Sequence, residues 1–275
     1  MKHFIRDLRK NIKKQHMPEK RIDGFHPSSL GSPYNCTRKY MIGYIAKKYG
    51  VDIKQKGIDP TKTLIFSIGH SLHDIVRDQF LGPAGYLKGN WVNKKTAEVH
   101  EGYMPKDSES PWKDWTYEEN RYRDNKYNIV GDEEFDITGA VDGVIVYKDE
   151  EMLLDIKTIN QYWWNRLDSV SETYQVQLMF YMYLTGYKKG AFLYVNKNTA
   201  ELKTFIVEWD QEIFDKFLEK SVTIPQKLLL EDKVEGRIDM CSSKTTMVAK
   251  GCDYCDICFS SDTNDLNVLK KFMGI

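Results

Sequence analysis

GAVDGVIVYKDEEMLLDIKT occupies residues 139–158 and carries the strongest structural signal in the chain. Two short runs, ITGAVDGVIVY at 137–147 and MLLDIKT at 152–158, are rich in Val, Ile and Leu. The polar residues KDEE at 148–151 separate them. Short runs of β-branched residues on either side of a polar turn predict a β-hairpin.

Two carboxylates belong to this predicted hairpin. Asp142 ends an apolar segment of the first run, and Asp155 lies near the end of the second. Because neighbouring strands are only about 5 Å apart, these side chains can converge. Two adjacent carboxylates repel each other unless a cation lies between them. A site made of oxygen ligands suits Mg²⁺ or Mn²⁺ better than zinc.

Lys157 follows Asp155 by two positions, so in a strand both side chains point to the same face. A carboxylate pair, a divalent metal and an ammonium group on one face form a site for hydrolysing a phosphodiester. The alternative interpretation is a solvated hairpin with ordinary surface charges.

Composition is that of a soluble globular protein, with 275 residues, 41% hydrophobic and 29% charged. The length allows one large domain or two small ones. No run approaches the roughly 18 apolar residues of a membrane helix, and residues 1–14 lack the apolar centre of a secretory signal. These features predict a cytoplasmic protein that does not associate with membranes.

The 40 basic and 40 acidic residues cancel, so net charge does not indicate nucleic-acid binding. Residues 1–23, however, hold eight Lys or Arg against three acids, and residues 4–15 can form a short basic helix. Such a segment could contact phosphates, or it could be a solvated helix face.

Two further helices are predicted on either side of the hairpin. Residues 64–80 place apolar residues on one face of a helix, and Gly69 and His73 form a G-x-x-x-H pattern there. The second helix begins at Ser171 and ends near Gly186. The apolar face of the first helix consists of Leu64, Ile68, Leu72, Ile75, Val76 and Phe80.

The remaining segments complete the predicted fold. Residues 118–128 are expected to begin the sheet, residues 190–208 to form two strands around NKNT, and residues 210–231 to form a helix interrupted at Pro225. This order predicts an α/β fold with a mixed central sheet flanked by helices. Aromatic residues among the charges of 81–130 are expected to pack on the sheet, with stacking on bases as the alternative. They are Trp91, Trp112, Trp115, Tyr117 and Tyr122.

Four of the five cysteines lie near the end of the chain. Cys252, Cys255 and Cys258 form C-x2-C-x2-C, with Cys241 upstream, while Cys36 precedes a helix expected from Thr37. Closely spaced cysteines in a chain without a secretory signal indicate a metal ion or cluster rather than disulfides.

The hairpin resembles the core of the PD-(D/E)XK nuclease superfamily, in which a strand carries D/E-x-K after an upstream Asp. The details G-x-x-D and D-x-K-T look most like the RecB-type exonuclease branch. That resemblance implies a restriction-endonuclease-like fold in one nuclease domain over residues 1–275. The domain comprises a basic segment 1–25, a nuclease core 26–235 and a cysteine-rich segment 236–275.

The same resemblance assigns the site residues. In the RecB-type family the G-x-x-x-H helix supplies a metal ligand, which implies His73, with His70 as the alternative. Q-x-x-x-Y corresponds to Gln177 and Tyr181, with Gln175 as the less favoured match. His73, Asp142, Asp155 and the main-chain carbonyl of Ile156 would then hold Mg²⁺ or Mn²⁺. Lys157 would orient the attacking water and stabilise the transition state.

The motif C-x-R-K at Cys36 is similar to the N-terminal cysteine motif of RecB-like nucleases with an iron–sulfur cluster, such as CRISPR-associated and AddB-type proteins. It implies a 4Fe–4S cluster on Cys36, Cys252, Cys255 and Cys258. The family spacing C-x2-C-x5-C differs from the spacing here. That difference admits Cys241 as a ligand and zinc as the metal.

The implied function is a DNA exonuclease of bacterial or phage DNA processing, recombination or repair. It would act on single strands or duplex ends, and a helicase or recombination partner would supply unwinding. One alternative is a DNA-binding or assembly module that keeps the fold with little catalysis. Another is a zinc-ribbon interaction protein with incidental carboxylates.

Overall fold

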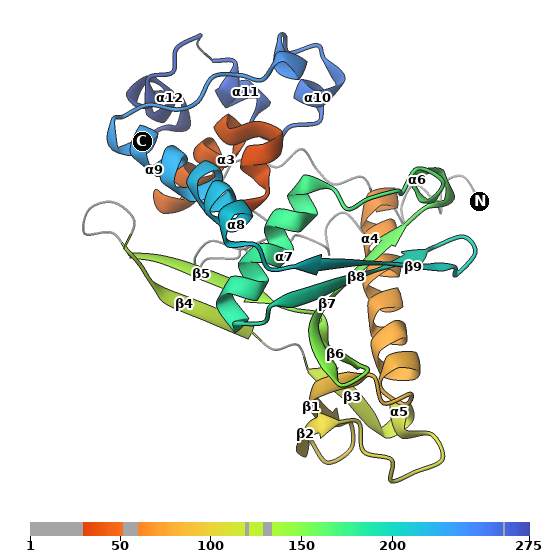
Figure 1. Ribbon diagram of the computed structural model, residues 1–275. Coiled ribbons are helices and arrows are strands. Elements are labelled where there is room, and N and C mark those ends of the chain that lie inside the picture. The colour runs from red at the N-terminus through yellow and green to blue at the C-terminus, as the bar shows by residue number, and fades with distance from the viewer. Residues whose placement is uncertain (1–29, 52–59, 119–120, 129–133, 261) are drawn as a thin grey trace, which may run out of the picture. The chain divides into compact units, whose positions relative to one another are not determined.

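The computed structural model describes residues 30–51, 60–118, 121–128, 134–260 and 262–275 (Figure 1). The predicted basic segment and its helix at residues 4–15 lie outside these residues. The chain divides into two compact units. The sheet unit comprises residues 64–124 and 137–211, and the helical unit comprises residues 1–63, 125–136 and 212–275.

A seven-stranded sheet organises the sheet unit, in the order β2-β1-β6-β7-β8-β9, with β3 paired to β1. The pair β7–β8 is parallel and the other pairs are antiparallel. The predicted α/β fold with a mixed central sheet is therefore confirmed. The strands are β1 (Leu87–Asn93), β2 (Val99–Tyr103), β3 (Trp115–Glu118), β6 (Gly143–Tyr147), β7 (Glu150–Ile159), β8 (Lys189–Asn196) and β9 (Leu202–Glu208).

The sheet begins earlier in the chain than predicted. Its first strand is β1, whose sequence LKGNWVN is too polar to show a clear period of two. Tertiary packing stabilises this strand, because its residue Trp91 is completely buried in the core. The prediction that the sheet begins at residue 118 is wrong for this reason.

The central hairpin forms as predicted between β6 and β7, with Val144 opposite Leu153. Lys148 and Asp149 both have positive φ, which is the geometry of a tight two-residue hairpin turn. The run at 137–147, however, is not one strand. Its first part belongs to β5 (Glu134–Ala140), which pairs with β4 (Arg121–Asn128) in a separate two-stranded sheet.

Helices cover both faces of the central strands. On one face, Val76 and Leu81 pack against the core that includes Leu154 and Ile156 of β7. On β8, Gly190 receives the side chain of Leu178 at van der Waals contact. The helices of this unit are α4 (Pro60–Asp74), the π-helix η1 (Ile75–Leu81), α5 (Pro111–Asp114), α6 (Gln161–Trp164) and α7 (Glu172–Thr185).

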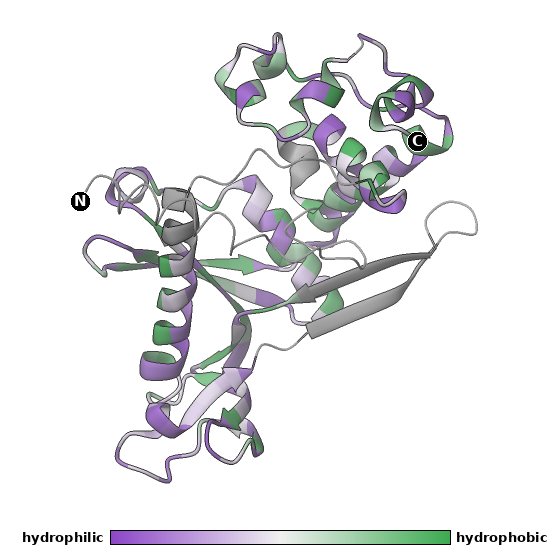
Figure 2. Cartoon of the chain, turned by 180° about the vertical axis from the view of Figure 1, so that it is seen from behind, coloured by the Kyte–Doolittle hydropathy of each residue, from purple (hydrophilic) through white to green (hydrophobic). Residues whose placement is uncertain are grey.

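The predicted helix at 64–80 changes its winding at Ile75, where the π-helix η1 begins. A π-helix has wider turns than an α-helix, so a stripe drawn with a period of 3.6 no longer follows one face. Phe80 is exposed as a result, and Ile68 is exposed beside the buried Gly69. The prediction that Ile68 and Phe80 belong to the packed apolar face of this helix is therefore wrong. In Figure 2 the long helix α4 carries both hydrophobic and hydrophilic colours.

Helix α7 has the predicted ends. The side chain of Ser171 accepts a hydrogen bond from the Tyr174 amide at the N-terminus, and Gly186 adopts a left-handed conformation at the C-terminus. The two strands predicted over 190–208 are β8 and β9. The helix predicted over 210–231 is interrupted before Pro225, because proline lacks the amide proton that a helix interior requires.

The expectation that aromatic residues pack on the sheet is confirmed for Trp91, Trp115 and Tyr117. All three are buried in the core of the sheet unit, and Trp112 packs against that core. The Tyr122 side chain lies outside the described side chains. The rest of this core consists of Leu87, Met104, Leu154, Ile156, Leu193 and Val195.

The helical unit has its own core, in which Met41 and Ile42 pack with Val234, Leu266 and Leu269. No helix in the described part of the chain is long and apolar enough to cross a bilayer. The elements of this unit are α3 (Ser32–Lys48), α8 (Gln211–Leu218), η2 (Glu219–Thr223), α9 (Ile224–Leu230), η3 (Asp239–Cys241), α10 (Met247–Lys250), α11 (Cys255–Cys258) and α12 (Leu266–Met273).

Candidate active site

Asp142 lies where the chain leaves β5 and enters β6. Its Oδ2 accepts a hydrogen bond of 2.6 Å from the backbone amide of Ile156 on β7. The same oxygen lies 3.7 Å from His73 Nδ1, at the end of α4. The Ile156 amide is thus bonded to a side chain of the neighbouring segment instead of to a backbone carbonyl. The backbone pairing of the hairpin therefore stops here, and the first run is divided at Asp142.

Asp155 and Lys157 form a buried ion pair on the opposite face of β7 from Ile156. Lys157 Nζ lies 2.7 Å from Asp155 Oδ1, and the Asp155 residue is only 3% exposed. Burial raises the pKa of Asp155 to about 6, and the nearby charge of Asp142 adds to this against the opposing effect of Lys157. Burial alone would lower the pKa of Lys157, but the carboxylate of Asp155 raises it overall.

The two carboxylates therefore differ in acidity. Burial by itself would raise the pKa of Asp142, but the nearby imidazole of His73 and the hydrogen bond from the amide of Ile156 lower it overall. Asp142 is therefore ionised at neutral and at mildly acidic pH, whereas Asp155 is still protonated at mildly acidic pH. Such divergent carboxylates are typical of functional sites.

Helix α7 supplies the next two groups. Lys157 Nζ donates to Gln177 Oε1 at 3.2 Å, and Gln177 Nε2 donates to the Tyr181 hydroxyl at 3.3 Å. Gln175 instead donates to the Val170 carbonyl at 3.3 Å. Of the two glutamines weighed from the sequence, the structure brings Gln177 to the lysine.

Gly69 explains how α4 comes close to β7. A Cβ atom at this position would lie 3.0 Å from Thr158 Oγ1, which is tighter than an ordinary contact. His73 is one turn further along the same helix face. The carboxylate contact is made by His73, while the His70 ring centroid lies 6.0 Å from that of His73.

Two nearby residues were missed by reasoning from the sequence. The ring of Tyr174 lies 4.6 Å from Lys157 Nζ, in a cation–π contact. Its spacing of three from Gln177 on one helix was an available signal. Lys197 Nζ comes within 3.5 Å of the Cβ position of Gly69. No local pattern marks that lysine, because the turn between β8 and β9 brings it there.

The donor set fits a hard divalent cation. It combines two carboxylates with an imidazole, and Asp155 Oδ1 is buried with no hydrogen-bond partner apart from its ion pair. Carboxylate oxygens are the ligands that Mg²⁺ and Mn²⁺ prefer. Within the described ranges, no three His, Cys, Asp or Glu side chains are already arranged as a metal-binding group.

The five cysteines gather in the helical unit as free thiols. Burial raises the pKa of the Cys241 thiol, and the neighbouring sulfurs of Cys36, Cys258, Cys252 and Cys255 raise it further. The structure therefore brings the N-terminal cysteine to the C-terminal ones. In the described residues these thiols do not form a ready metal-binding group either.

Cys36 interrupts the regular geometry of α3, with φ of −165° and ψ of 95°. The amide of Lys39 donates to its sulfur at 3.4 Å. Arg38, two residues after Cys36, is fully buried. Its guanidinium donates to the Glu235 carbonyl and to Asn264 Oδ1, both at 2.9 Å. These bonds tie α3 to the C-terminal segment.

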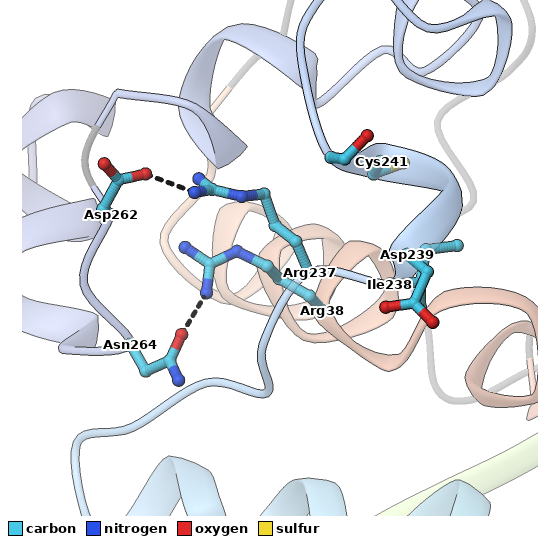
Figure 3. Close-up of a pocket in the computed structure, with 8 residues that line it drawn as sticks. Arg38, Arg237, Ile238, Asp239, Cys241, Asp262 and Asn264 are labelled. Carbon is cyan, nitrogen blue, oxygen red and sulfur yellow. Dashed lines mark hydrogen bonds and ion pairs between the residues drawn. The ribbon is translucent and has the colours of Figure 1, made fainter.

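A cavity of about 330 Å³ lies beside this cysteine group (Figure 3). Figure 3 shows the side chains of Arg38 and Arg237 next to each other, directed toward Asn264 and Asp262 respectively. Because acidic and amide groups take up both guanidinium ends, this cavity is a structural junction of the unit rather than an open anion site.

A model of the PD-(D/E)XK nuclease superfamily matches residues 25–259. No curated protein matches the chain. Among solved structures, the chain is similar to one titled "Crystal structure of SSO0001", with 13% identity, a TM-score of 0.46, and coverage of 93% of this chain and 96% of that one. It is also similar to LHK-Exo in complex with dAMP, with 11% identity, a TM-score of 0.46, and coverage of 76% and 89% respectively.

Proposed function

The chain belongs to the PD-(D/E)XK nuclease superfamily, and from this we propose that it is a divalent-metal-dependent deoxyribonuclease acting as an exonuclease. The observation that carries the proposal is the meeting of Asp142, Asp155 and Lys157 at the β6–β7 hairpin. They fit the superfamily's Asp…Asp-x-Lys pattern, and His73 lies near Asp142 while Gln177 accepts from Lys157.

We assign the metal ligands to His73, Asp142, Asp155 and the main-chain carbonyl of Ile156. A bound Mg²⁺ or Mn²⁺ supplies a water of lowered pKa and neutralises charge that builds on the phosphate. Asp142 is held in its ionised form by the His73 and Ile156 contacts, so one carboxylate is ready at any pH near neutrality. Asp155 completes the donor set once it has lost its proton.

Lys157 is the electrostatic group of the proposed reaction. The raised pKa of its ammonium keeps it charged at neutral pH. Gln177 and the Tyr174 ring hold the ammonium from the α7 side. A fixed positive charge in a largely buried site stabilises the negative charge of a phosphoryl transition state strongly, and its protons can orient an attacking water.

Gln177 and Tyr181 serve as positioning residues in this proposal. Gln177 donates to Tyr181 and accepts from Lys157, so the three groups form one hydrogen-bonded row along α7 and β7. Loss of the middle member would remove one hydrogen bond from each of its two neighbours, while Lys157 keeps its ion pair with Asp155. The expected effect is a slower reaction on a protein that is still folded.

We further propose that the protein is of the RecB-like branch and that its cysteines bind a 4Fe–4S cluster through Cys36, Cys252, Cys255 and Cys258. The mutual proximity of the sulfurs around Cys241 supports a shared ion or cluster. Zinc bound with Cys241 as a ligand is the alternative. In either case the cluster or ion would have a structural role: it would hold α3 against the C-terminal segment and take no part in cleavage.

The test is a Mn²⁺-dependent digestion of end-labelled single-stranded and duplex DNA. Asp155→Ala is the inactive variant, and Asp149→Asn, in the exposed turn of the same hairpin, is the matched control. Release of label by the wild type and by Asp149→Asn, but not by Asp155→Ala, supports the proposal. DNA binding by an intact protein without any cleavage would overturn it and favour a binding or assembly module.

A further inference from the structure

Helix α6 presents two neighbouring aromatic rings to solvent. Tyr162 is 58% exposed and Trp163 is 59% exposed. The ring centroids are 5.2 Å apart in an edge-to-face arrangement. The chain has six tryptophans, all within the described ranges, and Trp163 is the one that is mostly exposed. Such rings need an explanation other than core packing.

The backbone that carries the exposed pair is held in place by neighbouring side chains. The Trp163 amide donates to the side chain of Asn160 at 3.1 Å, and the Gln161 amide donates to Asn198 Oδ1 at 2.9 Å. The next residue, Trp164, is buried, with the ammonium of Lys203 lying 4.7 Å from the centroid of its ring. A surface that is fixed before binding loses little conformational entropy when a ligand arrives.

Positive charge lies on the same element. The guanidinium carbon of Arg166 lies 3.8 Å from the centroid of the Tyr162 ring. Arg166 also donates to the Tyr162 carbonyl at 2.9 Å, a bond that keeps the guanidinium close to the ring. An aromatic surface combined with a cation suits a ligand that has both π-faces and negative charge.

This surface follows directly in the chain after the strand that carries the candidate active site. Helix α6 begins two residues after the end of β7, the strand that carries Asp155 and Lys157. The distance along the strand from Asp155 to Ile159 is about 13 Å. Figure 1 shows α6 at the end of β7, beside the turn between β8 and β9. Lys197, from that turn, places its ammonium 3.5 Å from the Cβ position of Gly69 on α4, where Thr158 of β7 also comes close.

We propose that Tyr162 and Trp163 form a stacking platform for unpaired bases of single-stranded DNA whose backbone is cleaved at Asp142, Asp155 and Lys157. The proposal rests on the nuclease function proposed above and names its substrate class. Unpaired bases expose their faces to aromatic side chains, whereas bases inside a duplex are stacked on each other. The platform therefore selects single strands.

Fluorescence anisotropy of a labelled oligothymidylate, in buffer without added divalent metal, tests the platform apart from cleavage. Trp163→Ala is expected to bind about tenfold more weakly than the wild type, the effect of losing one stacked base. The matched control is Tyr147→Ala, because Tyr147 is 51% exposed and has the Lys148 ammonium 5.2 Å from its ring. That variant is expected to bind like the wild type.

An oligonucleotide with abasic positions separates stacking from a general loss of binding. The wild type is expected to prefer the normal oligonucleotide, and Trp163→Ala to lose that preference while Trp163→Phe keeps most of it. Binding of duplex DNA is expected to stay unchanged in all three proteins. Equal single-strand binding by Trp163→Ala and the wild type overturns the platform, as does an equal loss for single strands and duplex.

The two proposals fail in different ways. Cleavage by the wild type together with unchanged binding by Trp163→Ala overturns the platform and leaves the nuclease. Base-dependent binding that is lost in Trp163→Ala, without cleavage by the wild type in Mn²⁺, supports the platform and overturns the nuclease.

Discussion

Lys157 Nζ lies 2.7 Å from Asp155 Oδ1 on the face of β7 that α7 covers. Removing two charges from water costs several kcal/mol per ion, so a buried pair of this kind is weak evidence for stability. Here the pair is also next to Asp142, a second carboxylate that makes the site still less favourable in the absence of a cation. An arrangement that does little for stability is best explained by the chemistry it permits.

The first prediction concerns the ion pair itself. Asp155→Asn and Lys157→Ala are each expected to lower the rate of DNA cleavage at least about 100-fold, the usual effect of removing one electrostatic group from an active site. Both variants should fold: in Lys157→Ala the buried Asp155 can remain protonated and neutral, and in Asp155→Asn the ammonium of Lys157 keeps Asp142 and Gln177 nearby. Single-turnover cleavage and circular dichroism measure the two effects.

The matched controls for this prediction are Asp149→Asn in the hairpin turn and Lys113→Ala on the exposed side of α5. Both should cleave like the wild type. Full activity in Lys157→Ala would show that its ammonium has no part in the reaction.

The second prediction is a pH dependence set by Asp155, whose pKa is raised to about 6. Below that pH the carboxyl keeps its proton and cannot bind a cation, so cleavage at limiting Mn²⁺ should rise as pH increases through about 6. Because metal and proton compete for the same oxygens, more Mn²⁺ should move the midpoint to lower pH. Rates from pH 5 to 8 at two Mn²⁺ concentrations check this. The same midpoint pH at both Mn²⁺ concentrations would contradict this prediction.

The third prediction is metal-dependent stability, which does not require activity. Mn²⁺ at about 100 times its Kd should raise the free energy of unfolding by about 2.7 kcal/mol. Thermal unfolding with and without Mn²⁺ measures the shift. The shift should disappear in Asp142→Asn and in Asp155→Asn and persist in Asp149→Asn. An equal shift in all of these proteins would place the metal elsewhere.

The fourth prediction distinguishes the two glutamines of α7. Gln177→Ala removes one hydrogen bond from Lys157 and one from Tyr181, and it is expected to slow cleavage about 10- to 100-fold. Gln175→Ala removes only a bond to the Val170 carbonyl and should leave the rate within a factor of two or so. Steady-state cleavage of one labelled substrate compares them. A larger loss in Gln175→Ala would reverse the assignment.

The fifth prediction concerns the cysteine group. Protein purified without oxygen should be brown and contain iron, and Cys36→Ser should lose the iron and unfold at a lower temperature, because the group joins α3 to the C-terminal segment. Cys241→Ser should keep its iron if the four ligands are the proposed ones. A colourless protein with stoichiometric zinc, lost in Cys241→Ser, would establish the zinc alternative.

Local patterns predicted several elements well. The β6–β7 hairpin follows from two apolar runs and a polar turn, and α7 follows from a serine that caps its start and a glycine that ends it. Both depend on residues close in sequence, whose propensities act within a few positions. Polar strand β1 and the π-helix η1 gave no such signal, because burial of Trp91 and packing against the sheet stabilise them.

In the candidate site, too, some features follow from local sequence and others only from tertiary packing. Asp155 and Lys157 share a face because a strand alternates its side chains, which the sequence alone determines. Residue order could not show that Asp142 bonds to the Ile156 amide, or that Lys157 faces Gln177 rather than Gln175. Those contacts join residues 14 and 20 positions apart.

The amino-acid sequence by itself thus determined the hairpin, the caps of α7 and the residue types of the site. Only the tertiary structure decided which side chains meet, because the close approach of α4 at Gly69 and the packing of α7 on β8 at Gly190 depend on contacts between distant segments. Periodicity and capping are short-range effects, whereas the positions of His73, Gln177 and Trp163 follow from the packing of whole elements against one sheet.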